Sequence, residues 1–379
     1  MSLKDASKVL KKIFKESPIV PLDDSVFTKP MPHISTSVLS LDYLIGGKPN
    51  QHGVPPCPGF PRGRVVQLYG NPGAGKTTLA LTLARETIKA GGTVVYIDWE
   101  NEIDPRYADA IGVPITDEDK FVLVQPDTLE DGFKCMWAYA KFGADLIVVD
   151  SVGAGVPEDI FHQKDSEQGA IGRIGLLAAK WSGFLPKLKG LIAKSGTLVL
   201  GISQIRSSIP KGGRGPTTNV QGGNAWKFYS CVRMMLRVVS KEKQRVFNPL
   251  SGKQEEIVVG TMVNAKLDKC KVSPSAHGEA LFYLGHGEGI DSVRSVVEAA
   301  VACSVIKKGG AWYRWTPLDG EEIKGQGMKK FLEALGEEDI NMIFGQLSTA
   351  IAQSAFSEGD FKKEEDLEDL FGDSGLLDD

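Results

Sequence analysis

Short runs of apolar residues, separated by longer amphipathic stretches, recur along the chain and predict the strands of a sheet. The runs lie at 65–69, 93–98, 146–150, 197–202, 232–238 and 257–263. The early runs are apolar almost without interruption, which is typical of parallel strands covered by helices on both faces. Helix-length segments separate the four runs between 93 and 238. The pattern predicts an α/β fold with a doubly wound, mostly parallel sheet, in which ligands gather at the carboxyl ends of the strands.

The segments outside this core have a different character. Residues 3–14 place apolar side chains on one helical face and lysines elsewhere, which predicts a short amphipathic arm. A proline- and glycine-rich patch at 46–63 predicts a surface excursion. No apolar run approaches the roughly 18 residues of a membrane span, and the five cysteines are far apart. We therefore expect a cytoplasmic protein without membrane contact.

Charge is distributed unevenly along the chain. Residues 357–379 hold ten acidic residues against two lysines, so this tail is −8 within a net charge of −4, leaving +4 on the other 356 residues. A solvated terminus that aids solubility is one interpretation. The other is a polyanion mimic that competes with nucleic acid for a basic surface.

A glycine-rich segment between the run at 65–69 and a helix-like stretch is the strongest chemical signal. It is Gly70-Asn71-Pro72-Gly73-Ala74-Gly75-Lys76-Thr77-Thr78. Its amides can wrap a triphosphate at a helix N-terminus, Lys76 can reach the β- and γ-phosphates, and the Thr77 hydroxyl can hold Mg²⁺. A glycine-rich turn without a ligand is the alternative, but the strand and helix flanks favour a nucleotide site.

Acidic residues end two of the predicted strands, in the segments Asp98-Trp99-Glu100 and Asp150-Ser151. Asp150 is the natural partner of a Thr77-bound Mg²⁺. Glu100 is a candidate general base for the attacking water. Either acid could instead cap a helix or face solvent, but beside a phosphate loop the metal- and water-binding roles are favoured.

Regular pattern is lost from 207 to 223, directly after the strand end Gln204-Ile205-Arg206. This segment has five glycines and two prolines, and the cations at 206, directly before it, and at 211 and 214 within it have no acidic neighbours. One interpretation is therefore a mobile basic loop beside the nucleotide that becomes ordered when it binds an external polyanion. A plain flexible connector is the alternative.

Several segments in a fixed order resemble the RecA-type homologous recombinases, bacterial or phage-encoded. They are 34–42, 70–77, 96–107, 125–128, 147–151, 204–206, 222–229, 287–290, 310–313 and 325–327. The resemblance implies a RecA-like P-loop ATPase core with an N-terminal polymerisation arm and a small C-terminal α/β domain. The expected boundaries are 1–32 for the oligomerisation arm, 33–290 for the core, 291–352 for the small domain with a hairpin near 319–320, and 353–379 for the acidic tail.

The resemblance also implies roles around ATP. Glu100 falls at the family's water-activating glutamate, and Gln204 at the glutamine that senses the γ-phosphate. Asp104 and Tyr107 fall where the adenine is contacted and stacked. Lys269 and Lys271 match a lysine pair that reaches the ATP of the neighbouring subunit, although a solvated strand face would explain them without the resemblance. The implied catalytic residues are Glu100, Lys76, Gln204, Lys269 and Lys271, with ATP and Mg²⁺ as ligands.

DNA contacts are implied in the same way. The positions that hold the phosphate backbone are Ser182, Arg206, Gly222, Gly223 and Asn224. Ile209 falls where an apolar wedge separates base triplets. The chain departs from its relatives in lacking an aromatic residue in this loop, which has Lys211 and Arg214 instead, and in having Pro186 where an arginine is expected. The candidates for compensating contacts are Arg173, Ile174 and Lys180.

The sequence thus predicts a DNA-dependent ATPase that forms helical filaments on single-stranded DNA and pairs that strand with a homologous duplex. Its expected partners are single-stranded and duplex DNA, further copies of itself, and single-strand-binding and loader proteins. A ring helicase or clock-type ATPase with the same core is an alternative, against which the Ile209 loop argues. A mediator that hardly hydrolyses ATP is another, against which Lys76, Glu100 and Gln204 argue.

Overall fold

The computed structural model describes residues 29–47, 55–162, 170–208, 217–273, 276, 278–317 and 320–354. The predicted arm up to residue 28 and the predicted tail from residue 355 lie outside these residues. The chain divides into two compact units, Met1–Ala299 and Ala300–Asp379. The domain boundaries expected from the sequence stay a prediction.

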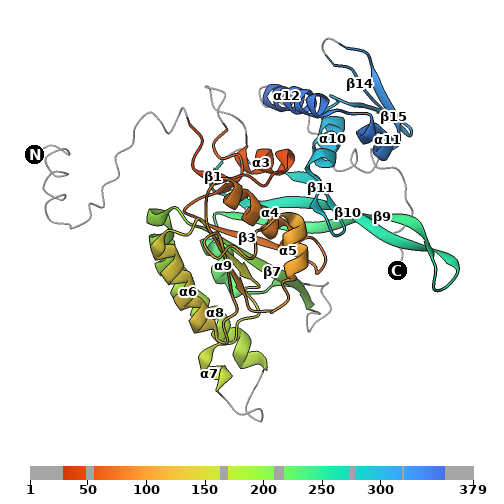
Figure 1. The fold of residues 1–379 in the computed structure, drawn as a ribbon. Coiled ribbons are helices and arrows are strands. Elements are labelled where there is room, and N and C mark those ends of the chain that lie inside the picture. Colours follow the sequence, from red (N-terminus) through yellow and green to blue (C-terminus); the bar gives the residue numbers. More distant parts are fainter. Residues whose placement is uncertain are drawn as a thin grey trace, which may run out of the picture. The chain divides into compact units, whose positions relative to one another are not determined.

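A large sheet forms the centre of the first unit (Figure 1). Its parallel part has the order β5-β4-β6-β7-β3-β9, and antiparallel strands continue it beyond β9 in the order β10-β11-β12. The parallel strands are β3 (Val65–Gly70), β4 (Val94–Asp98), β5 (Phe121–Val124), β6 (Leu146–Asp150), β7 (Leu198–Ser208) and β9 (Val232–Asn248). The others are β8 (Thr217–Val220), which pairs with β7, β10 (Lys253–Cys270), β11 (Glu279–Gly285) and β12 (Gly289–Ile290).

Helices cover both faces of this sheet, because successive side chains along each strand point to opposite faces. Val66 and Leu68 pack with one helical layer and Val65 with the other. The first layer contains α3 (Leu39–Gly46), α4 (Lys76–Lys89) and α5 (Pro105–Ile111). The second contains α6 (Leu129–Phe142), α8 (Ala170–Ser195) and α9 (Gly223–Tyr229). The predicted doubly wound, mostly parallel α/β class is confirmed.

Local signals determine where the helices near the strand ends begin and stop. Asp104 caps α5 by accepting a hydrogen bond from the Arg106 amide at 2.8 Å, and Pro105 occupies the first helical position. Gly112 ends the same helix in the left-handed conformation. Thr128 caps α6 by accepting from the Asp131 amide. These caps place the helices so that their first turns border the carboxyl edge of the sheet.

The β9 and β10 strands form a far longer hairpin than the runs at 232–238 and 257–263 predicted (Figure 1). The added residues, such as Lys243, Arg245 and Glu256, are polar and exposed, so no apolar run marks them. Cross-strand hydrogen bonds and ion pairs support this ribbon, with Glu256 lying 3.5 Å from Lys243 and 3.6 Å from Arg245.

Two further expectations are corrected. Regular structure does not end after Arg206, because β7 continues to Ser208 and pairs antiparallel with β8. The patch at 46–63 is not entirely a surface excursion, since Cys57 and Phe60 are fully buried and β2 (Phe60–Pro61) pairs with β1 (His33–Ile34). In both places backbone pairing supplies the order that the side-chain pattern does not show.

The remaining elements are short, cross the boundary between the two units or belong to the second unit. They are α7 (Glu158–Phe161), α10 (Ser292–Ala302), β13 (Lys307–Gly309), β14 (Trp312–Trp315), β15 (Ile323–Gln326), α11 (Met328–Glu333) and α12 (Glu337–Ser354). In the second unit β13, β14 and β15 form an antiparallel sheet, in which the β14–β15 pair is the predicted hairpin; residues 318–319 lie outside the described residues. Trp315 is buried there and donates to Gln346 Oε1 at 2.9 Å. Within the described ranges, no helix combines the length and apolar character needed to cross a membrane.

Candidate functional site

The phosphate loop turns between β3 and α4, as the sequence predicts. Gly75 is the N-cap of α4 and has φ 79°, a left-handed conformation that glycine adopts without strain. The Lys76 ammonium folds back over the loop and donates to the carbonyls of Gly70 at 3.1 Å and Asn71 at 2.8 Å. Burial lowers the pKa of Lys76, whereas the carboxylates of Asp150 and Glu100 act in the opposite direction. The loop thus holds a cation and a helix N-terminus where a phosphate chain can bind.

Thr77 and Asp150 meet beside this loop. The Thr77 hydroxyl donates to Asp150 Oδ2 at 2.9 Å, and the buried Tyr96 hydroxyl donates to the same oxygen at 2.7 Å. Burial raises the pKa of Asp150, the two hydrogen bonds oppose this, and the neighbouring acids Glu100 and Asp98 add to it. A hydroxyl and one carboxylate next to a phosphate site are the protein ligands that Mg²⁺ commonly takes. The residues therefore fit a magnesium ion.

Glu100 is held by two partners, one directly after β6 and one within β7. Ser151 donates its hydroxyl to Glu100 Oε1, and Gln204 Nε2 lies 3.3 Å from Oε1 and 3.5 Å from Oε2. Asp98 supports the same turn by accepting from the Glu100 amide at 3.2 Å and the Ile103 amide at 3.2 Å. The ends of β4 and β6 and the middle of β7 thus bring the predicted base and the predicted sensor into hydrogen-bonding range.

A cavity of about 330 Å³ opens between the phosphate loop, α5 and the β10–β11 edge. Predicted residues that line it are Gly73, Gly75, Lys76, Thr77, Thr78 and Tyr107. The Tyr107 hydroxyl is 2.7 Å from Thr78 Oγ1, whereas Asp104 is exposed and is not among the described residues that line the cavity. Residues that the sequence reasoning missed are Thr261, Leu284, Gly285, His286 and Gly287. The motif at 287–290 was the one signal that could have indicated this wall.

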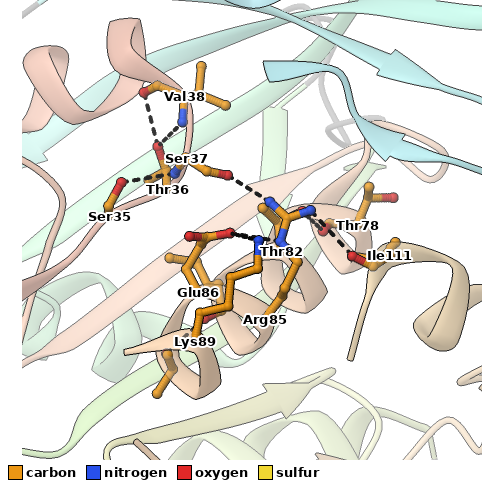
Figure 2. A network of polar contacts seen from close by, with 12 residues as sticks. Ser35, Thr36, Ser37, Val38, Thr78, Thr82, Arg85, Glu86, Lys89 and Ile111 are labelled. Atoms are coloured by element: carbon orange, nitrogen blue, oxygen red, sulfur yellow. Dashed lines mark hydrogen bonds and ion pairs between the residues drawn. The ribbon is translucent and has the colours of Figure 1, made fainter. Parts of the chain in front are cut away.

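A polar network ties α4 to α5 and to the segment before α3 (Figure 2). Arg85 donates to the Ser37 hydroxyl at 2.9 Å, to the Ile111 carbonyl at 3.3 Å and to Glu86 at 2.7 Å. Since α4 carries the phosphate loop and α5 carries Tyr107, Arg85 holds two walls of the cavity together.

Lys269 and Lys271 lie away from this cavity, at the opposite end of the sheet. Lys269 is paired in register with Arg233 and donates to the carbonyls of Lys227 at 2.7 Å and Phe228 at 3.1 Å. Burial lowers the pKa of Lys269, and the nearby charges of Lys271, Arg233 and Lys189 lower it further. A second cavity of about 250 Å³ has among its described lining residues Lys271, Lys189 and Arg64 but no carboxylate. The end of the sheet that carries Lys269 and Lys271 can attract an anion. Because it lies opposite the phosphate loop, these lysines cannot reach a phosphate bound at the loop of the same protomer.

The predicted DNA residues are placed unevenly by the structure. Ser182 is exposed on α8, and its hydroxyl donates to the Ala178 carbonyl at 2.8 Å. Gly222 caps α9, at whose start Gly223 and Asn224 are exposed. Lys180 is paired with Glu130 and Asp159, each at 2.7 Å. Arg173 and Ile174 belong to α8 and Arg206 to β7, whereas those outside the described residues are Ile209, Lys211 and Arg214.

The doubly wound sheet and the phosphate loop at its carboxyl edge define a P-loop nucleotide-binding protein. A family model described as the RecA N-terminal domain matches residues 1–291. The chain therefore belongs to the RecA family, which confirms the resemblance found in the sequence.

Similar proteins extend over most of the chain. Protein RecA of Laribacter hongkongensis is 37% identical over 339 residues, which cover 89% of this chain and 86% of that protein. Protein RecA of Thermus thermophilus is 35% identical over 337 residues, covering 89% of each. Protein RecA of Campylobacter fetus subsp. fetus is 33% identical over 371 residues, covering 96% of this chain and 98% of that protein. The similarity thus includes residues well beyond the P-loop core.

Proposed function

We propose that this protein is an ATP-dependent homologous recombinase of the cytoplasm. It forms helical filaments on single-stranded DNA, pairs that strand with a homologous duplex, and hydrolyses ATP when DNA is bound. The observation that carries the proposal is the meeting of Lys76, Thr77, Asp150, Glu100 and Gln204 at one edge of the sheet. Gln204 also begins the part of β7 that leads into the predicted DNA loop.

Each of these side chains has a role in the proposed reaction. The Lys76 ammonium, which now donates to two loop carbonyls, can donate to phosphate oxygens instead. Thr77 and Asp150 would hold Mg²⁺, which, when bound, neutralises phosphate charge and orients the phosphate chain. Glu100 accepts the proton of the attacking water, and Ser151 and Gln204 keep its carboxylate oriented. Gln204 thereby links the nucleotide to the loop that contacts DNA.

Filament formation places the cations of one protomer at the nucleotide of the next. Lys269 and Lys271 lie at the sheet edge opposite their own phosphate loop, so they cannot act on the nucleotide of their own protomer. Cations delivered across an interface stabilise the charge that develops on the phosphoryl oxygens only once the polymer has formed. Hydrolysis would then depend on assembly as well as on DNA.

Replacing Glu100 with glutamine tests the assignment of the base. Glutamine keeps the shape and can still accept from Ser151, so ATP binding should persist, whereas turnover should fall by about 10²- to 10⁴-fold with the loss of the proton acceptor. ATP hydrolysis and nucleotide titration measure the two quantities. Glu102→Gln is the matched control, because Glu102 is exposed only two residues away. Normal turnover in Glu100→Gln would remove Glu100 from its role.

The function as a whole is tested by ATP hydrolysis with and without single-stranded DNA, on samples that are also imaged for filaments. Strong stimulation with helical filaments supports the recombinase. Turnover that is independent of DNA, on closed rings, would favour a motor or switch with the same core. DNA binding with negligible turnover would favour a mediator. A chain that ends before Ser357 should bind duplex DNA more readily if the acidic tail is inhibitory.

A further inference from the structure

Three tryptophans form one buried cluster on the face of the sheet that α6, α8 and α9 cover. Trp181 lies edge-on to Trp99, with ring centroids 6.0 Å apart, and edge-on to Trp226 at 5.0 Å. Phe133 extends the cluster at 4.7 Å from Trp181 and stacks on Phe184 at 4.1 Å. Trp181 and Trp226 have no exposed surface, and Trp99 is 8% exposed. Trp181 is therefore the ring through which the other two tryptophans are connected.

Each tryptophan lies within two positions of a residue for which the resemblance to the RecA family implies a contact with water, nucleotide or DNA. Trp99 directly precedes Glu100, Trp181 directly precedes Ser182, and Trp226 follows Asn224 by two positions. The three segments come from the end of β4, from α8 and from α9. Ser182 and Asn224 are exposed, whereas the tryptophans beside them point into the core. The end of β4, α8 and α9, each with its own proposed ligand contact, thus pack against one another through the same buried tryptophan cluster.

The rings fit closely against the backbone around them. A Cβ atom at Gly132 of α6 would lie 2.1 Å from Trp99, and one at Gly201 of β7 would lie 2.2 Å from Trp226. Trp181 Nε1 donates to the Val152 carbonyl at 3.0 Å, which fixes the orientation of the central ring. In an interior packed at this density, a shift of one ring displaces its neighbours.

We propose that Trp181 is a positioning residue that couples the two DNA-facing helices to Glu100. DNA bound at Ser182 or Asn224 shifts α8 or α9, and the contacts of Trp181 with Trp226 and Trp99 carry that shift to the peptide that bears Glu100. This inference rests on the proposed function. It implies that the stimulation of ATP hydrolysis by DNA depends on the cluster, whereas nucleotide binding and DNA-independent hydrolysis do not.

The test compares Trp181→Leu and Trp181→Phe with the full wild-type chain. The measured quantity is the ratio of ATP turnover with saturating single-stranded DNA to turnover without DNA. Coupling between sites ordinarily corresponds to factors of about 5 to 150, so we expect Trp181→Leu to lower the ratio at least about fivefold. Trp181→Phe keeps an aromatic edge and should lower the ratio less.

Trp315→Leu is the matched control for the loss of a buried tryptophan. Trp315 is 2% exposed and donates one hydrogen bond, as Trp181 does, but it belongs to the second unit and is not a member of the cluster. Its replacement should lower the melting temperature and leave the ratio unchanged.

Gly132→Ala perturbs the cluster from the side of α6, where the new methyl group meets the six-membered ring of Trp99. This variant should lower the ratio as well.

The measured ratios distinguish a failure of the proposed role of Trp181 from a failure of the recombinase proposal on which it rests. A wild-type chain that DNA does not stimulate refutes the recombinase proposal itself. A stimulated wild type together with a folded Trp181→Leu of unchanged ratio overturns the coupling. An equal loss in Trp315→Leu overturns it too, because the effect is then one of general stability. If Trp181→Leu does not fold, the ratios of Trp181→Phe and Gly132→Ala decide in the same way.

Discussion

Replacing Asp42 with asparagine will stabilise this protein at neutral pH but hardly in acid. Asp42 lies in α3, is 8% exposed, and accepts hydrogen bonds from Ser35 Oγ at 2.5 Å and from the Thr36 amide at 2.8 Å. Burial raises the pKa of Asp42 to about 6, because the hydrogen bonds from Ser35 and Thr36 offset only part of the cost of burying the charge. Asparagine has the same shape, can accept from Thr36 and can keep its contact with Ser35, but it carries no charge.

The sign and size of the effect follow from proton linkage. Between about pH 4 and pH 6 the folded chain holds a proton on Asp42 that the unfolded chain releases, so the free energy of unfolding falls as the pH rises. A change in pKa from 3.8 to about 6 corresponds to a loss of about 3 kcal/mol once the pH exceeds 6. The asparagine variant has no titratable group at position 42, so its unfolding free energy does not fall in this way as the pH rises.

Urea-induced unfolding followed by far-ultraviolet circular dichroism measures the effect. The difference in unfolding free energy between variant and wild type isolates Asp42, because every other group titrates in both proteins. We expect the difference to be below about 1 kcal/mol at about pH 4 and about 3 kcal/mol in favour of the variant at about pH 7.5. A difference of the same size at both pH values would refute the reasoning, since it would show that Asp42 does not titrate as a buried acid.

Two further substitutions concern the walls of the nucleotide cavity. Arg85→Lys should lower the unfolding free energy by about 2 kcal/mol and weaken ATP binding, because one ammonium cannot serve both the Ser37 hydroxyl and the Ile111 carbonyl. Urea unfolding and nucleotide titration check this, with exposed Arg106→Lys as control, and unchanged values for Arg85→Lys would contradict it. Tyr107→Phe removes the hydroxyl that lies 2.7 Å from Thr78 and should weaken ATP binding about fivefold, or about 1 kcal/mol. Titration at unchanged melting temperature measures this loss, and equal affinities would show that the hydroxyl does not support the cavity.

The sequence by itself determined the parts of this protein whose physical signal is local. Strands buried on both faces must be apolar throughout, so the run at 146–150 predicted β6 to the residue. A phosphate loop is one contiguous segment whose glycines, lysine and threonine act together. The sequence also indicated the polar residues that follow the apolar runs, and three of these, Glu100, Asp150 and Gln204, do lie close together, although β7 continues beyond Gln204 to Ser208.

Strands with mostly polar side chains on both faces could not be predicted, because no run of apolar residues marks them in the sequence. The outer part of the β9–β10 hairpin is ordered by backbone pairing and by ion pairs such as Lys243 with Glu256. The β7–β8 pairing is likewise a backbone ladder, and it follows a run whose apolar pattern ends at residue 202. Hydrogen bonds between strands depend on which segments meet, which a single pattern of side chains does not encode.

Tertiary structure alone decided which distant residues act on one another. The register of β10 with β11 places Thr261 opposite Leu284 and its hydroxyl 3.0 Å from His286 Nε2, and this closes the cavity opposite the phosphate loop. The order of strands in the sheet brings Ser151 to Glu100, and helix packing joins Trp99 to Trp181. Each of these pairs is separated by many residues, so the physical cause of their contact is the packing of the whole sheet and its helices.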